Sequence, residues 1–180
     1  MYGIINRAIE DLVTENFGAA KWEAIKKRSG VNVEFFISTE PYDDDLTYKL
    51  ANAVADELHI PLNEVLVKFG EWWVLNTANE KYKGLMSTGG DNLKEFLLNL
   101  PVFHNRIMLM YPKLTPPEFK ISDVEANSIC LHYFSKRQGL QEFVRGLLIG
   151  LGKMYTTEIT IELIQSRTEG STHEIFKVIW

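Results

Sequence analysis

The sequence is poor in the residues that several common kinds of protein require. It holds a single cysteine, Cys130, so it can form no internal disulfide and offers no thiolate cluster for zinc. Its 19 lysine and arginine residues are outnumbered by 24 acidic residues, and this balance argues against a nucleic-acid surface. The longest apolar run lies around residues 147–149 and is far too short to span a membrane.

Signatures of secretion and of common enzyme classes are missing as well. Residues 1–7 contain no basic region followed by an apolar core, so we expect no signal peptide and a cytoplasmic location. There is no phosphate-binding glycine loop and no nucleophile elbow. The 4 histidines show no pairing at metal-ligand spacing, which argues against a zinc site. What remains is a globular chain of 180 residues, long enough for one domain or two small fused lobes.

Apolar periodicity divides the chain into two parts. The first two thirds repeat apolar residues at helical spacing, while the later part alternates as strands do. This order predicts an α+β fold, with a helical lobe at about 1–60 and an antiparallel-sheet lobe with one packed helix at about 61–180. We expect helices within 4–17, 22–29, 46–58, 61–73, 79–88 and 91–112, an extended segment or loop at 32–38, strands at 120–122 and 128–135, a helix at 140–154, and a hairpin of strands at 157–165 and 174–180.

An acidic run, Asp43–Asp45, precedes the third predicted helix. Carboxylates complement the positive end of a helix, and they also suit a hard cation. The position directly before a helical pattern favours the first explanation.

The helix predicted at 91–112 carries a histidine on an apolar face. Asn92 and Glu95 form a capping-box pattern at its start, and Pro101 should kink or restart it. His104 then lies in the middle of an apolar stripe, so it is either a hydrogen-bonded core residue or a ligand for a buried group. The helical pattern alone favours the core interpretation. The stripe consists of Leu100, Phe103, Ile107, Met108 and Tyr111.

A second candidate set follows the strand predicted at 128–135. In an extended chain, Tyr133, Ser135 and Arg137 point to the same side. Two hydroxyl groups and a guanidinium can converge on a compact anion such as a carboxylate, although a solvated strand end explains the spacing equally well. Together with an imidazole on an apolar helix, this set describes what haem requires, namely a ligand for the iron and partners for two propionates.

The tyrosine-x-serine-x-arginine motif downstream of His104 resembles the H-NOX (haem nitric oxide/oxygen binding) family. This family includes bacterial gas sensors and the haem domain of soluble guanylate cyclase, and stand-alone cyanobacterial members look most similar. The resemblance covers essentially the whole chain. It extends to Met1-Tyr2-Gly3, Phe69-Gly70-Glu71, Pro116-Pro117, His132-Tyr133 and the glycine-rich helix near Gly146.

The resemblance implies roles for the residues of both candidate sets. By it, His104 is the proximal ligand of haem b, which lies between the two lobes. Tyr133, Ser135 and Arg137 bind the propionates, and we refer to them as the carboxylate clamp. Asp44 matches an aspartate that pairs with the clamp arginine.

The resemblance also implies the residues that line the haem faces. Pro117 matches a proline that presses on the porphyrin. Oxygen-binding members have a tyrosine where this chain has Phe143, and a tryptophan and an asparagine where it has Ile9 and Trp73. The distal pocket positions are matched by Ile5, Ile9, Trp73, Phe143 and Leu147.

These correspondences imply a gas sensor and not an enzyme. It would bind nitric oxide and carbon monoxide at ferrous haem, exclude oxygen, and signal through release of His104. The partner in trans would be a histidine kinase or a cyclic-di-GMP enzyme, with no nucleic acid and no membrane involved. Two alternatives remain open: an oxygen-binding haem sensor or carrier, and a module that binds a small carboxylate without haem.

Overall fold

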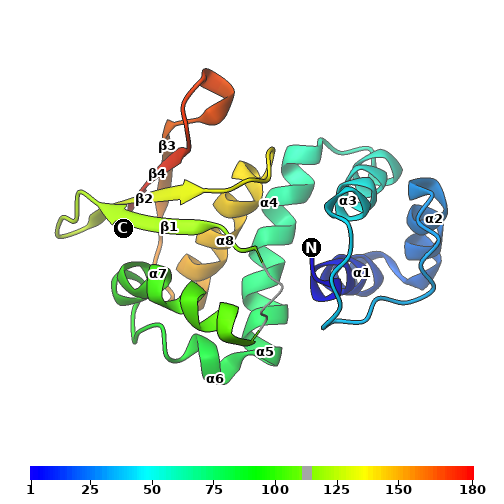
Figure 1. The fold of residues 1–180 in the computed structure, drawn as a ribbon, viewed down its shortest axis with the longest axis horizontal. Coiled ribbons are helices and arrows are strands. Elements are labelled where there is room, and N and C mark those ends of the chain that lie inside the picture. The colour runs from blue at the N-terminus through cyan, green and yellow to red at the C-terminus, as the bar shows by residue number, and fades with distance from the viewer. Residues whose placement is uncertain (111–114) are drawn as a thin grey trace.

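The computed structural model describes residues 1–110 and 115–180, and the side chain of Met110 lies outside that description. Helices of the N-terminal part lie on one side of α4, and a sheet with its own helices lies on the other (Figure 1). The predicted α+β fold is therefore confirmed. The helices are α1 (Gly3–Phe17), α2 (Ala19–Ser29), α3 (Asp44–Leu58), α4 (Leu62–Trp72), a π-helix (Trp73–Ala78), α5 (Asn79–Lys81), α6 (Lys83–Met86), α7 (Leu93–Met110), α8 (Gln141–Met154) and a 3-10 turn (Arg167–Glu169). The strands are β1 (Glu118–Ser122), β2 (Ser128–Phe134), β3 (Thr160–Gln165) and β4 (Glu174–Ile179).

The N-terminal lobe buries the apolar faces of α1, α2, α3 and the first turns of α4. Its core includes Ile25 and Leu50, which have no exposed surface. Asp43 caps α3, because its Oδ1 accepts a hydrogen bond of 2.9 Å from the backbone N–H of Asp45. The acidic run therefore begins a helix, as expected. Residues 32–38 form a loop without a strand.

A change of helix type marks the junction of the two lobes. The helix predicted to open at Pro61 is α4, which has Pro61 as its N-cap and widens into a π-helix at Trp73. Such widened turns often occur at functional sites. Along the chain, Phe69 is the last buried residue of the helical lobe's core, and Val74 is the first of the sheet lobe's core. The side chain of Trp73 lies between them in sequence and packs against both cores.

Helix α7 begins with the predicted cap. The backbone N–H of Glu95 donates to Oδ1 of Asn92 over 3.0 Å, and Oε2 of Glu95 accepts from the backbone N–H of Asp91 over 2.9 Å. Pro101 lies inside α7, which continues through it, so the helix does not restart there. Tyr111, predicted on the same apolar face, lies outside the described residues, as does Pro112.

The second lobe is built on an antiparallel sheet with strand order β1-β2-β4-β3. Leu131 of β2 is paired with Phe176 of β4, and both are fully buried. Because side chains alternate along a strand, one face of the sheet supplies the core that also receives Leu97 of α7 and Leu148 of α8. The predicted hairpin is confirmed, with β3 beginning at Thr160. Among the described residues, no helix combines the length and the apolarity needed to cross a bilayer.

Two glycines allow α4 and α8 to touch backbone to backbone. A Cβ atom at Gly70 would overlap the carbonyl oxygen of Phe143, and one at Gly146 would overlap the carbonyl oxygen of Val67. Any side chain at these positions would therefore push the helices apart. Residues of α8 and of the π-helix that continues α4 line the apolar cavity described below.

Candidate functional site

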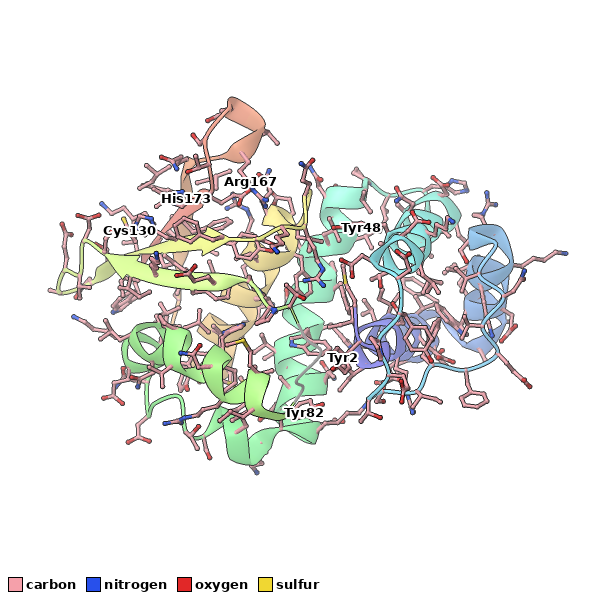
Figure 2. The ribbon with its side chains drawn as sticks, viewed as in Figure 1. Tyr2, Tyr48, Tyr82, Cys130, Arg167 and His173 are labelled. Carbon is pink, nitrogen blue, oxygen red and sulfur yellow. The ribbon has the colours of Figure 1, made fainter. Side chains whose placement is uncertain are left out.

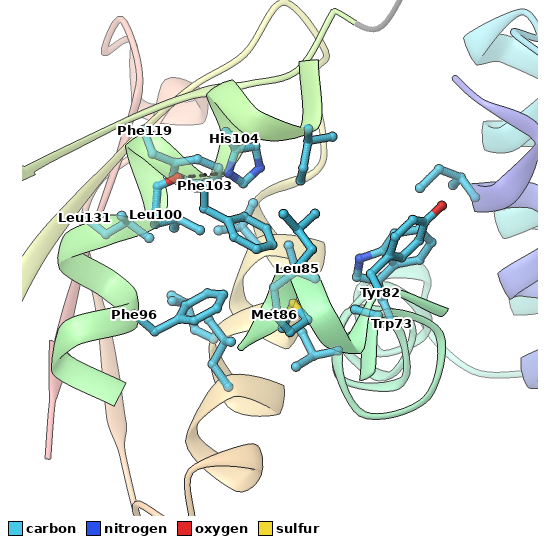
Figure 3. A pocket seen from close by; sticks show the side chains of 18 of the residues that line it. Trp73, Tyr82, Leu85, Met86, Phe96, Leu100, Phe103, His104, Phe119 and Leu131 are labelled. Carbon is cyan, nitrogen blue, oxygen red and sulfur yellow. Dashed lines mark hydrogen bonds between the residues drawn. The ribbon is translucent and has the colours of Figure 1, made fainter. Parts of the chain in front are cut away.

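An apolar cavity lies inside the second lobe and reaches the start of α1. It encloses about 190 Å³, whereas well-packed protein cores contain few voids larger than a water molecule. Its wall is formed mainly by aliphatic and phenyl groups, including Phe96, Phe103 and Leu131 (Figure 3). His104 is the imidazole in this wall. An apolar cavity with few polar groups is the usual form of a small-molecule or cofactor site.

The imidazole of His104 has a fixed protonation pattern. Its Nδ1 lies 3.2 Å from the carbonyl oxygen of Leu100, one turn earlier on α7. A carbonyl can only accept, so Nδ1 carries the proton and Nε2 keeps a lone pair. Burial lowers the pKa of His104 to about 4, against the opposing effect of the Leu100 hydrogen bond, so the ring is neutral at pH 7. A neutral imidazole with one nitrogen donating to the backbone is arranged as metal-ligating histidines are.

A chain of aromatic rings connects His104 to the carboxylate clamp. The ring of Phe119 lies 4.7 Å from the imidazole and 5.5 Å from the ring of Tyr133, between ring centroids. Phe119 was not among the predicted site residues. The signal that could have identified it is the alternation along β1, which turns Phe119 inward while Glu118 and Lys120 stay exposed.

The carboxylate clamp forms a compact group, but not by lying on one strand. β2 ends at Phe134, so the expectation that all three residues share a strand face is wrong. Ser135 connects them instead. Its Oγ accepts from the backbone N–H of Arg137 over 3.1 Å, and hydrogen bonding with Ser135 partly opposes the burial that raises the pKa of Tyr133. Tyr133 is only 3% exposed.

Arg137 is held by residues from two other segments. Its Nε donates to Oδ2 of Asp44 over 2.7 Å, its Nη2 reaches Oδ1 over 3.3 Å, and its Nη1 donates to the carbonyl of Thr115 over 2.7 Å. The amino group of Met1 also bonds Asp44. Burial acts to raise the pKa of Asp44, but the bonds from the Met1 amine and Arg137 outweigh it and lower that pKa. The structure therefore places Asp44 beside the clamp arginine.

The predicted distal residues separate into two groups. Ile5, Trp73 and Leu147 line the cavity. Ile9 and Phe143 do not line it, because they pack around Phe69 on the side of the helical lobe. The rings of Phe69 and Phe143 are 5.1 Å apart, and Ile9 shares a second, smaller cavity with Phe69.

Other placements could not be read from the sequence. Pro117 comes directly before β1 and does not line the cavity, although Phe119 does. Tyr2 and Tyr82 also line the cavity. Neither residue was among the predicted site residues. Tyr82 lies between the short helices α5 and α6, where no periodicity indicates which way a side chain points.

His132 and His173, which no sequence pattern relates to each other, are in contact in the structure. Nδ1 of His132 lies 2.9 Å from Nε2 of His173, and Oγ of Ser122 lies 2.8 Å from the other nitrogen of His132. Within the part of the chain that the structure describes, no group of three or more potential metal ligands forms around them. The sequence had suggested no histidine pair, because His132 lies on β2 and His173, which directly precedes β4, is 41 positions further along the chain.

The residues present fit a haem. The cavity is large and apolar, a neutral imidazole with an available Nε2 stands in its wall, and a guanidinium and two hydroxyl groups lie nearby for anionic groups. Burying a propionate requires partners of this kind.

Comparisons with known proteins agree with this chemistry. A family model described as Haem-NO-binding matches residues 2–163. Two soluble guanylate cyclases of Caenorhabditis elegans are similar: gcy-31 is 28% identical over 165 residues (91% of this chain, 24% of that protein), and gcy-35 is 30% identical over 178 residues (94% and 25%). The chain thus spans about a quarter of the length of these relatives. An H-NOX protein from S. oneidensis, solved in the Fe(II)NO ligation state, matches with a TM-score of 0.90 at 22% identity over 99% of this chain and 98% of that chain. With a family model that covers most of its length, the chain belongs to the Haem-NO-binding, or H-NOX, family.

Proposed function

We propose that this chain binds haem b in the cavity, with His104 as the protein ligand of the iron. The observation that carries the proposal is the bond from Nδ1 of His104 to the carbonyl of Leu100, since it leaves Nε2 unprotonated beside an apolar cavity. Bound haem would supply a ferrous iron at which a diatomic gas can coordinate. The protein's part is to hold the imidazole neutral and correctly oriented.

The carboxylate clamp would bind the propionates. Arg137 offers a charge-assisted partner, while Tyr133 and Ser135 offer hydroxyl groups. Because Asp44 already shares the guanidinium, it would fix the orientation of Arg137 and reduce the positive charge available to a propionate. The carboxylate clamp would thus orient the cofactor as well as retain it.

The proposed ligands of this sensor are nitric oxide and carbon monoxide. Bound oxygen requires a hydrogen-bond donor near its outer atom far more than these gases do. Most of the cavity wall offers only apolar atoms, and Phe143 lies outside it. The S. oneidensis neighbour was solved with nitric oxide on its iron, which supports a ligand of this class. The possible donors in the wall are Trp73, Tyr2 and Tyr82, and they are the residues to test.

The proposed signal is release of His104, which would free α7 from the cofactor. The chain would then act on a partner in trans, either a histidine kinase or a cyclic-di-GMP enzyme. The related guanylate cyclases support coupling to a signalling enzyme. The size of any response is bounded by the difference in gas affinity between the two conformations.

An absorption spectrum of the ferrous protein tests the proposal directly. We expect a Soret band, a shift of that band with nitric oxide and with carbon monoxide, and no stable oxygen complex in air. Absence of a Soret band after haem reconstitution would favour the carboxylate-binding module. A stable spectrum of the oxygen complex would make the protein an oxygen sensor or carrier. Trp73→Phe, Tyr2→Phe and Tyr82→Phe would then identify the donor, with Tyr42→Phe as a control because Tyr42 packs in the core of the helical lobe.

A further inference from the structure

Two of the three clamp residues, Ser135 and Arg137, lie just beyond the end of the sheet strand that carries Tyr133. β2 ends at Phe134, so the backbone carbonyls of Ser135 and Arg137 have no strand partner. Partly buried carbonyl groups require another donor. Both receive one from Arg167, a residue about thirty positions further along the chain.

Arg167 contacts every member of the carboxylate clamp. Its Nη1 donates to the carbonyl of Ser135 over 2.6 Å, and its Nη2 donates to the carbonyl of Arg137 over 3.0 Å. Its guanidinium carbon lies 5.9 Å from the centre of the Tyr133 ring, at the outer limit of a cation–π contact. Arg167 lies in the turn that connects β3 to β4, and Figure 2 shows it near the end of β2.

A buried carboxylate fixes the direction of this guanidinium. Nε of Arg167 lies 2.8 and 2.9 Å from the two oxygens of Glu174, whose side chain is 3% exposed. The turn that carries Arg167 is itself attached to the start of α8. Oγ of Ser166 accepts from the backbone N–H of Thr168 and donates to Oε1 of Gln141. The guanidinium therefore has three nitrogens committed to three different acceptor groups.

We infer that Arg167 is a positioning residue, which holds the carboxylate clamp in the geometry that receives the propionates. The inference rests on the proposed haem function. Arg167 faces backbone carbonyls and Glu174, so it acts through Ser135 and Arg137 and not on the cofactor itself. A lysine could keep the ion pair with Glu174 but could not reach both carbonyls, because its ammonium lacks the planar fork.

The test measures how fast haem leaves the protein for a scavenger globin, with two forms of the cofactor. Haem b carries free propionates, whereas its dimethyl ester has both carboxylates capped. We expect the wild-type protein to release the ester faster than haem b. Arg167→Gln should accelerate release of haem b about tenfold and leave release of the ester unchanged, because it disturbs only the contacts to carboxylates. Arg167→Lys should release haem b at a rate between those of the wild-type protein and Arg167→Gln. If the glutamine variant does not fold, the lysine variant provides the test.

Arg145→Gln is the matched control. Arg145 also forms a half-buried ion pair, 3.0 Å from Glu142, and donates to the carbonyl of Ile161 over 3.0 Å, but it does not contact the carboxylate clamp. It should change release of the two cofactors equally or not at all. Equal acceleration of both cofactors by the Arg167 variants, or no acceleration, would overturn the inference and leave the proposed function intact. If the wild-type protein retained neither cofactor, the proposed haem site itself would be wrong. If it released both at the same rate, the carboxylate clamp would not hold the propionates, and the inference would fall with that role.

Discussion

Asp44 and Arg137 are 93 positions apart in the sequence, and the structure joins them by two hydrogen bonds of 2.7 and 3.3 Å. The pair connects α3 of the helical lobe to the segment that follows β2. Since Nη1 of Arg137 is bound to Thr115, each nitrogen of this guanidinium has an acceptor. Contacts within the protein therefore hold Arg137 in place from both lobes without the help of a ligand.

Retention of haem should depend more on Arg137 than on Ser135. Arg137→Ala should accelerate haem transfer to a scavenger globin about tenfold or more, because it removes the charge-assisted partner of a propionate. Ser135→Ala should change the rate only a few-fold by removing a neutral hydrogen bond. Arg137→Lys should restore part of the loss. Equal rates for all three variants would show that the carboxylate clamp does not face the propionates.

His104→Gly should remove the bond between the protein and the iron. Added imidazole should occupy the vacated space and restore a five-coordinate ferrous spectrum. His59→Asn serves as control, since His59 is an exposed residue at the end of α3 with a positive φ of 55° that asparagine tolerates. If the glycine variant kept the wild-type ferrous spectrum without imidazole, another residue would be the ligand.

The apoprotein should lose stability in acid because of His104. The folded pKa of about 4 lies below the ordinary value of 6.5, so the unfolded chain binds this proton more readily. The stabilisation is complete above pH 6.5 and falls by up to about 3 kcal/mol as the pH drops towards 4. Urea unfolding at several pH values should show a shallower loss for His104→Gln than for the wild type or His59→Asn. Parallel curves for all three proteins would contradict the assignment.

The contact between α4 and α8 should tolerate no added methyl group. Gly70→Ala and Gly146→Ala should each destabilise the apoprotein by about 1–3 kcal/mol, because the new Cβ overlaps a backbone carbonyl of the other helix. Gly84→Ala is the control. Nothing lies within 4 Å of a Cβ at Gly84, which is in a helix, so this change should stabilise by up to about 1 kcal/mol. The melting temperatures of the three variants can be compared by thermal unfolding. If Gly70→Ala or Gly146→Ala left the stability unchanged, the two helices could move apart without cost.

Local periodicity predicted what depends on neighbours in the sequence. It predicted the apolar face of α7 with His104 on it, the cap at Asn92, and the hairpin that ends the chain. These features arise from side-chain alternation and backbone hydrogen bonds within a few residues. The pairing of Asp44 with Arg137 was expected only from the family resemblance.

Contacts between distant segments could not be predicted in this way. The extended geometry assumed for the three clamp residues fails because β2 ends at Phe134 and the chain turns towards Arg167 and Asp44. Phe143 was assigned to the distal pocket, but its ring packs on Phe69. The positions of Arg167 and Tyr82 depend on how separate elements meet, and no repeat in the sequence encodes that.

Trp73 packs against the cores of both lobes and also lines the cavity. A side chain shared in this way couples the melting of one lobe to that of the other, so the two should unfold in a single cooperative transition. Anything that binds in the cavity stabilises the folded state by mass action. Filling the cavity should therefore raise the melting temperature of α1 and α2, which lie on the far side of α4, together with that of the sheet (Figure 1).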